Sequence, residues 1–251
     1  EGVWQWVTGE EWNYENWSSN EPSNGSGNPN IDGEHYMEIY KNSGNWNDRF
    51  LNFKEGYILE IPKVDLESGL VAYYPFNGNA NDESGNGNDG VVHGAMLAED
   101  RFGTVQSSFE TGIGKGIKIS QISEFAGNKA KTLSVWVKMD SKNYGIPIIV
   151  VGATGQVGSN FGIQYTSTGW RFLSHLRHFD IGELDLDSNW NQHTIVYDGS
   201  VVIYYVNGII KGSKVTNLNT ANSEIQIGIY TYDTNWDFDG FVDDVRFYNR
   251  A

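Results

Sequence analysis

Short runs in which apolar residues recur at every second position set the fold class of this chain. Between residues 131 and 137, Leu133, Val135 and Val137 fall on one face of an extended segment, because strand side chains alternate between two faces. No stretch of 12 or more residues has the periodicity of a helix. The pattern therefore predicts a mainly β fold built from short strands.

Hairpin signals separate these runs. Residues 194–206 are rich in Ile, Val and Tyr, which favour strands. Asp198-Gly199 interrupts this stretch and Asn207-Gly208 follows it. Both dipeptides are typical of tight turns between antiparallel strands. We therefore predict an antiparallel β-sandwich.

Charge and cysteine content exclude several classes of protein. The chain has a formal net charge of −15 and no cysteine. A disulfide scaffold and a cysteine-bound zinc site are excluded, and nucleic-acid binding is disfavoured because an acidic surface repels phosphate. No apolar run reaches the roughly 20 residues of a membrane-spanning helix, so membrane insertion is not expected. The acidic balance suits an extracellular or periplasmic protein that holds cations; the alternative is that the charge only keeps the protein soluble.

A change in composition near Pro62 divides the chain. We assign residues 1–62 to a first domain, 63–68 to a linker and 69–251 to a second domain. About 60 residues are marginal for an independent core, whereas about 180 residues suit a jelly-roll sandwich.

The first region contains an ordered series of Trp, Asn and Glu motifs. They are Trp4-Gln5-Trp6, Tyr14-Glu15-Asn16-Trp17, Glu21-Pro22-Ser23-Asn24, Glu34-His35-Tyr36, Gly44-Asn45-Trp46-Asn47-Asp48 and Gly56-Tyr57-Ile58-Leu59-Glu60. With this order and spacing, the region resembles the C-terminal half of a C-type lectin-like domain. The resemblance implies a calcium ion that also binds two neighbouring sugar hydroxyls.

Calcium takes six to eight oxygen ligands, chiefly from carboxylates and carbonyls. The candidate metal ligands in this region are Glu21, Ser23, Glu34, Asn47 and Asp48. The candidate sugar contacts are Glu21, Asn24, Glu34, Asn47 and Asp48. Ser23 stands where the mannose-type motif of the family has Asn, and a hydroxyl is a poorer calcium ligand than an amide carbonyl. The alternative is that Trp46-Asn47-Asp48 is a core tryptophan followed by a turn, in a domain that binds protein.

The resemblance starts in the middle of the C-type lectin-like domain. The first half of the family's fold and its cysteines are missing, and Tyr36 and Leu59 occupy two of the cysteine positions. Half a core and an open sheet edge would remain. We therefore expect a covering element, supplied either by an upstream segment or by another copy of the chain.

The second region resembles a laminin-G-like, concanavalin-A-like jelly roll of bacterial surface proteins over residues 66–251. Three blocks carry the match. The first is Gly69-Leu70-Val71-Ala72-Tyr73-Tyr74-Pro75-Phe76 with the Asn/Gly-rich residues 77–87. The second is Trp190-Asn191-Gln192-His193-Thr194 with Tyr204-Tyr205-Val206-Asn207-Gly208, and the third is Phe238-Asp239-Gly240-Phe241-Val242-Asp243-Asp244-Val245-Arg246-Phe247-Tyr248-Asn249-Arg250. The resemblance implies a calcium site on Asp82 and Asp243, completed by loop carbonyls. Weaker candidate ligands are Asp89, Asn79 and Gly87.

The alternation of side chains along residues 241–247 indicates that the Asp243 carboxylate needs a cation or a hydrogen-bond donor as a partner. Phe241, Val245 and Phe247 are expected to share one face with Asp243 among them. A carboxylate on an apolar face needs a cation or hydrogen-bond donors. The alternative to calcium is an Asx-turn at Asp82 and an arginine partner for Asp243.

No enzyme is expected. Glu183-Leu184-Asp185-Leu186-Asp187 comes close to the Glu-x-Asp-x-Glu strand motif of retaining glycanases, but its last acid is Asp, and an exposed alternating strand explains it better. The five histidines do not cluster in sequence as a zinc site would require.

Aromatic residues in loops are a second sign of a ligand, because sugar rings stack on aromatic rings. Tyr232 and Trp236 belong to one aromatic and polar loop, together with Tyr230, Asp233, Asn235 and Asp237. Trp170 and Tyr144 are expected in other loops. The alternative is that these side chains pack in the core or at a sheet edge.

These observations predict a non-catalytic extracellular recognition or adhesion protein that binds a carbohydrate or surface glycan with the help of calcium. One alternative is a structural subunit of a cell-surface assembly or filament, in which copies of the chain complete the first domain. Another is a targeting module of a larger secreted enzyme.

Overall fold

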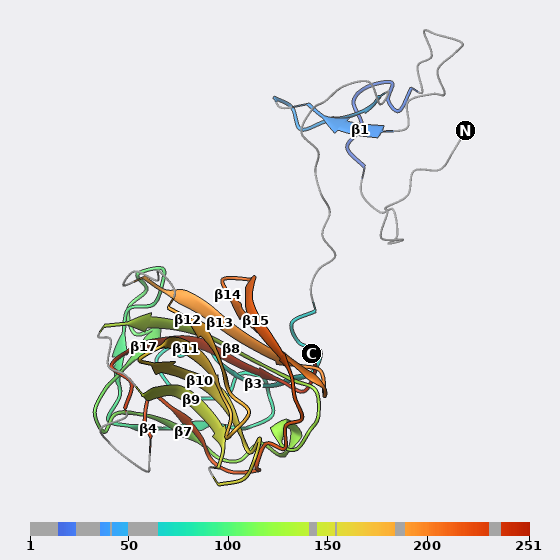
Figure 1. Cartoon of the computed structure of the whole chain (residues 1–251). Helices are drawn as coiled ribbons and strands as arrows, with labels where there is room; N and C mark the ends of the chain where they lie inside the picture. The colour runs from blue at the N-terminus through green and yellow to red at the C-terminus, as the bar shows by residue number, and fades with distance from the viewer. Residues whose placement is uncertain are drawn as a thin grey trace. The chain divides into compact units, whose positions relative to one another are not determined.

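Strands make up nearly all of the regular structure. The computed structural model describes residues 15–23, 36–40, 42–49, 65–140, 145–153, 155–183, 189–230 and 237–251. In these residues the only helical element is a single 3-10 turn, η1 (Ser123–Phe125). The chain divides into two units, Glu1–Val64 and Asp65–Ala251 (Figure 1). The predicted mainly β, antiparallel fold is confirmed.

In the first unit, a short antiparallel hairpin is built around Trp46. It consists of β1 (Tyr36–Ile39) and β2 (Trp46–Arg49). The indole rings of Trp17 and Trp46 meet edge to face with centroids 5.6 Å apart, and Trp46 is buried. Trp46 is therefore a core residue of this unit. The C-type lectin-like assignment of residues 1–62 stays a prediction.

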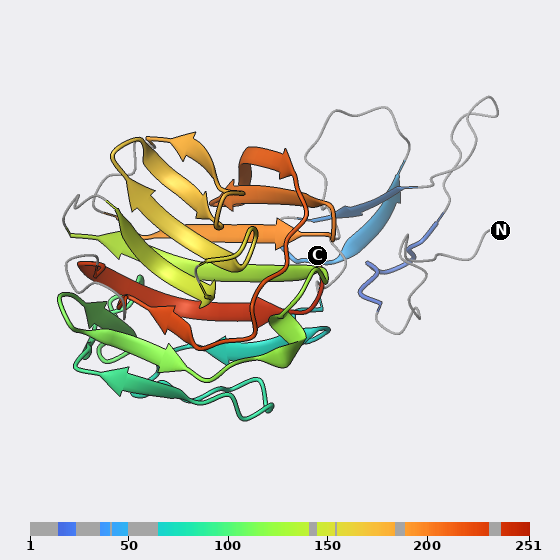
Figure 2. The same cartoon turned by 60° about the horizontal axis from the view of Figure 1, so that its bottom comes forward.

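Two antiparallel sheets form the second unit (Figures 1 and 2). Sheet I contains, in spatial order, β15 (Ile209–Val215), β14 (Val201–Val206), β13 (Asn191–Tyr197), β8 (Lys131–Met139), β17 (Gly240–Tyr248), β6 (Ser108–Thr111) and β5 (Met96–Ala98). An additional strand, β3 (Leu70–Tyr74), pairs with β17. Sheet II contains β12 (Phe179–Gly182), β11 (Gly169–Leu173), β10 (Asn160–Thr166), β9 (Ile146–Gly152), β16 (Ile225–Ile227), β7 (Gly116–Ile119) and β4 (Gly90–His93).

A continuous apolar core lies between the two sheets. As predicted, Leu133, Val135 and Val137 of β8 share the buried face. Aromatic contacts cross from one sheet to the other through η1, where the ring of Phe125 lies 5.3 Å from that of Phe247 and 5.4 Å from that of Phe161. Burying a phenylalanine side chain contributes roughly 1.5–3 kcal/mol of transfer free energy, so this core stabilises the sandwich strongly.

The strands β13, β14 and β15 follow one another as a meander joined by the predicted turns. Asp198 Oδ1 accepts the backbone N–H groups of Ser200 and Val201, both at 2.7 Å. Asn207 and Gly208 have positive φ angles of 50° and 75°, as a tight turn between twisted strands requires. Both turn predictions are confirmed.

A β-bulge interrupts β17. The register between β17 and β8 shifts between Asp243 and Arg246, and Asp244 has a φ angle of 50°. A bulge inserts an extra residue into one strand, so the alternation of faces restarts after it.

The bulge makes the predicted face assignment of β17 wrong. Val242, Val245 and Phe247 all lie in the core, whereas Phe241 is only half-buried and lies under the ammonium group of Lys138. Asp243 is paired with Trp136, which alternates with the buried residues of β8. Asp243 therefore lies on the outer face of sheet I and not among Val245 and Phe247.

The second unit begins before the predicted domain boundary. Residues 65–68 were assigned to the linker, but Arg250 Nη2 donates to the carbonyl of Asp65 at 2.9 Å and Arg250 Nε donates to that of Ser68 at 2.7 Å. These bonds attach the segment to the end of β17. In the described parts of the chain, no helix is long and apolar enough to cross a membrane.

Candidate functional site

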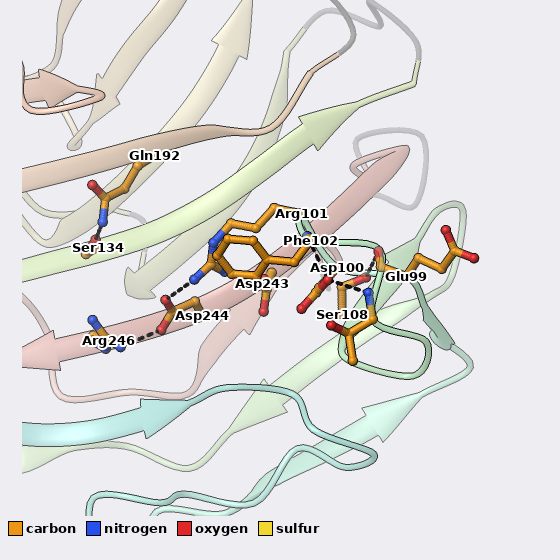
Figure 3. A network of polar contacts seen from close by, with 11 residues as sticks. Glu99, Asp100, Arg101, Phe102, Ser108, Ser134, Gln192, Asp243, Asp244 and Arg246 are labelled. Atoms are coloured by element: carbon orange, nitrogen blue, oxygen red, sulfur yellow. Dashed lines mark hydrogen bonds and ion pairs between the residues drawn. The ribbon is translucent and has the colours of Figure 1, made fainter. Parts of the chain in front are cut away.

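A network of charged and aromatic side chains covers part of the outer face of sheet I (Figure 3). At its centre is Arg101, from the loop between β5 and β6. Arg101 Nη1 donates to Asp243 Oδ2 at 2.5 Å, and Nη2 donates to Asp244 Oδ2 at 3.0 Å. The side chain of Asp243 is only 3% exposed. The ion pair is thus largely shielded from water. Its charge–charge attraction is therefore screened less than that of an exposed pair.

The bulge in β17 brings two neighbouring aspartates to the same arginine. In a regular strand, side chains at adjacent positions point to opposite faces. The positive φ angle of Asp244 removes this alternation, so the carboxylates of Asp243 and Asp244 both reach Arg101. Asp244 Oδ1 also lies 2.9 Å from Arg246 Nη2, as Figure 3 shows. Asp244 therefore links two arginines.

Aromatic rings support both guanidinium groups. The Cζ atom of Arg101 lies 4.6 Å from the ring centroid of Phe102 and 4.8 Å from that of Trp136. The Cζ atom of Arg246 lies 4.5 Å from the ring centroid of Tyr73. Each such contact contributes about 0.5–1 kcal/mol at an exposed site. The rings restrict how the guanidinium groups turn, which orients their N–H donors.

The loop that carries Arg101 is itself fixed by hydrogen bonds. Asp100 Oδ1 accepts the backbone N–H groups of Phe102 and Thr104, both at 2.8 Å. Ser108 Oγ, at the start of β6, donates to the carbonyl of Glu99 at 2.8 Å. Arg101 is therefore held in place by its own loop as well as by its partners on β17.

Burial changes the protonation of the central carboxylate. It raises the pKa of Asp243 to about 7, although the guanidinium of Arg101 opposes the shift. The negative charge of Asp244 adds to the rise. Asp243 is therefore a group whose charge changes near neutral pH.

Uncharged polar groups extend the network onto β13. Gln192 Nε2 donates to Ser134 Oγ at 3.2 Å, and Ser134 Oγ lies 3.2 Å from Thr194 Oγ1. Hydroxyl and amide groups can both donate and accept hydrogen bonds. Ser134 shares a face of β8 with Trp136, so this face combines a half-buried indole with charged and neutral hydrogen-bonding groups.

Sequence reasoning identified Asp243 but missed the other members of the network. Arg101 is 142 positions away from Asp243, and no sequence pattern predicts that pairing. Asp100 and Gly103 mark a turn around Arg101, which is a sign of a loop but not of a site. Trp136 looks like one more position in an alternating strand.

Asp82, the other predicted ligand in this unit, lies in the loop after β3 and accepts backbone hydrogen bonds. Its Oδ1 accepts the N–H groups of Tyr73 and Ser84, and its Oδ2 accepts that of Asn88, all at 2.9 Å. Partial burial alone would raise the pKa of Asp82, but these hydrogen bonds lower it below its ordinary value. The carboxylate thus organises the Asn/Gly-rich loop.

The weaker candidates lie in the same loop. Asp89 Oδ1 accepts the N–H of Asp82 at 2.8 Å, and Asn79 Oδ1 accepts the N–H of Asn81 at 2.7 Å. Gly87 has a φ angle of 75°, which a turn of the loop requires. The structure therefore brings Asp82 and Asp89 together, and it places Asp243 with Arg101.

These surroundings do not fit a calcium ion shared by Asp82 and Asp243. Calcium needs oxygen ligands, whereas the groups that contact the two carboxylates are N–H donors and a guanidinium. An Asx-turn at Asp82 and an arginine partner for Asp243, the alternative stated above, are both present. In the described residues, no three His, Asp or Glu side chains lie together in a way that could hold a metal. The calcium site on these residues stays a prediction.

In the first unit, three predicted ligands meet and a fourth does not join them. The backbone N–H of Ser23 donates to Glu21 Oε2 at 2.8 Å and to Asp48 Oδ1 at 2.9 Å. Asn47 Nδ2 donates instead to Glu38 Oε1 on the paired strand, at 2.9 Å. Adjacent side chains of β2 point to opposite faces, which separates Asn47 from Asp48. The predicted residues Asn24 and Glu34 lie outside the described ones.

Two of the aromatic ligand candidates, Tyr232 and Trp236, also lie outside the described residues, as does Tyr144. The residues on either side of 231–236 are joined, because Asp237 Oδ1 accepts the N–H of Tyr230 at 2.7 Å. Asp237 Oδ2 also accepts the N–H of Gly114, in the turn between β6 and β7, at 2.6 Å. The expectation that Trp170 lies in a loop is wrong.

Trp170 belongs to β11 and is buried. Its ring lies 4.0 Å from that of the buried His193, because β11 faces β13 across the core. Of the acidic motif at 183–187, only Glu183 is described, and its Oε1 accepts the hydroxyl of Tyr165 at 2.9 Å.

The model of one protein family matches residues 111–251, which is more than half of the chain. Its description is the concanavalin A-like lectin/glucanases superfamily. The chain belongs to this superfamily. The laminin-G-like, concanavalin A-like resemblance is thus confirmed over residues 111–251, from the end of β6 to three residues beyond the end of β17. A comparison with curated proteins found no match.

Solved structures with this superfamily fold include domain 4 of AbnA, a GH43 extracellular arabinanase from Geobacillus stearothermophilus, in complex with arabinotriose. It is 20% identical, with a TM-score of 0.59 over 72% of this chain and 92% of that one. The binding domain of Paraclostridial Mosquitocidal Protein 1 is 19% identical, with a TM-score of 0.57 over 74% of this chain and 50% of that one. The binding domain of botulinum neurotoxin DC in complex with SialylT is 15% identical, with a TM-score of 0.55 over 74% of this chain and 48% of that one. This chain spans about half the length of both toxin domains, and the likeness shows the shared fold.

Proposed function

We propose that the second unit is a non-catalytic carbohydrate-binding module whose ligand lies on the outer face of sheet I around Arg101. The observation that carries the proposal is the guanidinium of Arg101, oriented by Asp243 and Asp244 beside Phe102 and Trp136. Sugars offer hydroxyls that pair with oriented N–H donors and C–H faces that pack on aromatic rings. This face supplies both kinds of contact.

Relatives with the same fold support a binding role. Two of the structures named above were solved with arabinotriose and with SialylT, and two are called binding domains. The fold alone hosts many functions. The place of the ligand on this chain is therefore argued from its own side chains.

Absence of catalysis is part of the proposal. Retaining and inverting glycosidases need one carboxylic acid and one carboxylate open to the scissile bond. In the Arg101 network, the carboxylates of Asp243 and Asp244 are both closed by arginine. The arrangement is suited to binding and not to proton transfer.

The context we propose is a secreted protein in which this unit targets a larger assembly or enzyme to a glycan. Support comes from the AbnA structure, which is one domain of an extracellular arabinanase and matches this chain over 92% of its length. A structural subunit of a surface assembly is the alternative, and sedimentation of the full chain would reveal it as large polymers. Calcium takes part in none of the proposed contacts.

Affinity electrophoresis of the full chain in gels containing plant and bacterial polysaccharides tests the proposal. Arg101→Ala should lower the affinity about 10-fold or more, because hydrogen bonds to a charged group are worth about 1.5–3 kcal/mol. Arg171→Ala is the matched control, since Arg171 forms a similar pair with Asp180 on sheet II, at 2.5 Å from Nε to Oδ1. Equal losses in both variants, or none in Arg101→Ala, would contradict the proposed site.

A further inference from the structure

The charges of the Arg101 network balance one another. Arg101 contacts Asp243 and Asp244, and Arg246 contacts Asp244. Above the pKa of Asp243, which is about 7, two guanidinium groups thus face two ionised carboxylates. The site offers directional N–H donors without a surplus of positive charge.

The next row of the same face is balanced too. Phe241 of β17 pairs with Lys138 of β8 on one side and with Glu110 of β6 on the other. Residues directly opposite one another in a sheet point to the same face. The ammonium of Lys138 lies 4.4 Å from the ring centroid of Phe241, and Glu110 lies on the same face of the sheet on the other side of Phe241.

Arg101 keeps unused hydrogen-bonding capacity. A guanidinium has five N–H donors, and the described contacts use one for Asp243 and one for Asp244. In the part of the chain that the structure describes, the remaining three have no acceptor. The neighbouring Phe102 is 77% exposed, so an apolar surface lies beside these donors.

We infer that this face takes a neutral glycan and rejects a carboxylated one. The inference rests on the proposed function and names its substrate class. Sugar hydroxyls can accept the free N–H groups of Arg101 without adding charge. A uronate would instead place a third carboxylate beside Asp243 and Asp244, in a chain whose net charge is −15. Like charges at such distances repel, so the acidic sugar is disfavoured.

The first experiment compares neutral with carboxylated polymers. Affinity electrophoresis of the full chain at about pH 8, where Asp243 is ionised, would use arabinan, xylan and galactan in one arm and polygalacturonate and alginate in the other. We expect binding in the neutral arm only, with a dissociation constant that changes less than about two-fold between low and high NaCl. Tightest binding to a carboxylated polymer, lost in Arg101→Ala, would overturn the inference but keep the proposed function. Binding to neither arm would overturn both.

A charge variant tests the reason for the selectivity. Asp244→Asn removes the carboxylate shared by Arg101 and Arg246 but keeps the size of the side chain. It should gain binding to polygalacturonate by about 10-fold or more. Asp180→Asn is the control, because it frees Arg171 on sheet II and should gain none. Circular dichroism melting checks that both variants fold, and Asp243→Asn replaces Asp244→Asn if the latter does not. An equal gain in the control, or no gain in either network variant, would overturn the inference.

Discussion

Arg101 and Asp243 are 142 positions apart in the sequence and meet at 2.5 Å on the outer face of sheet I. The pair ties the loop between β5 and β6 to the bulge of β17. Since Asp243 is buried and changes charge near neutral pH, the strength of this tie depends on pH. The same contact thus affects both the stability of the unit and the order of the proposed ligand face.

The pKa of Asp243 predicts how stability changes with pH. Burial raises it from 3.8 to about 7, so between these values the folded state keeps a proton that the unfolded state has released. The contribution of Asp243 to the free energy of unfolding should therefore fall as the pH rises from about 4 to about 7. Urea unfolding of the wild type and of Asp243→Asn at several pH values measures it. The two curves should diverge, and parallel curves would refute the prediction.

Asp82→Ala should destabilise the second unit by about 2–3 kcal/mol, because the backbone N–H groups of Tyr73, Ser84 and Asn88 lose their acceptor. Asp198→Ala is the matched control. Asp198 also accepts two backbone N–H groups, but it lies at an exposed turn, so water can accept these N–H groups once the carboxylate is removed. Calorimetric melting should show a clearly larger loss for Asp82→Ala. Similar losses would mean that Asp82 does not organise its loop.

Chelation separates the hydrogen-bonded arrangement from the calcium site predicted by the resemblance. Because Asp82 and Asp243 are contacted by N–H donors, we expect EDTA to leave the melting temperature of the second unit unchanged. A metal that binds only the folded state raises its stability. A fall in melting temperature with EDTA that disappears in Asp243→Ala would therefore establish the calcium site instead.

Lys131, at the start of β8, is completely buried. Its Nζ donates to the carbonyls of Phe125 and Gly127 and to Thr220 Oγ1, at 2.7, 2.8 and 3.0 Å. Burial, together with the nearby charge of Lys129, lowers the pKa of Lys131 from 10.5 to about 7. Between these values only the unfolded state holds the proton, so the contribution of Lys131 to stability should rise with pH.

Lys131→Met removes the titrating group and keeps an apolar chain of similar length. Relative to this variant, the wild type should gain stability as the pH rises from about 7 to about 10. Guanidinium unfolding at three pH values is the measurement. A stability difference between the two proteins that stays constant with pH would rule out the titration.

Alternating apolar residues were enough to predict the β-sandwich and the strands within residues 131–137 and 194–206. The face of β8 and the two turns of the meander were predicted correctly, because local sequence dictates a strand's period and a tight turn's backbone. The bulge of β17 was not. A single residue at a φ angle of 50°, Asp244, reversed the face of everything before it, and Asp is only one of several residues that tolerate that conformation.

The candidate site could be predicted only in part. Asp243 stood out as a carboxylate among apolar neighbours, and an arginine partner was one stated alternative. Which arginine it is depends on the packing of the loop between β5 and β6, which is 142 positions from Asp243 in sequence although β6 pairs with β17. Tertiary packing of this kind leaves no local trace in the sequence. Trp136 illustrates the same limit, because the predicted alternation places it opposite the core face of β8 but does not show that Arg101 lies over its ring.

The position of β17 has a consequence for how the second unit folds. This strand pairs with β8 along one side and with β6 and then β3 along the other, and it follows every other strand of the unit in sequence. In Figure 2 the red β17 lies between the green β8 and the cyan β3. Until β17 is synthesised, the strands of sheet I form three separate parts, namely β15-β14-β13-β8, β6-β5 and β3 alone, and joining them requires contacts across most of the chain. Such a high contact order predicts slow folding that is completed only after synthesis of the last strand.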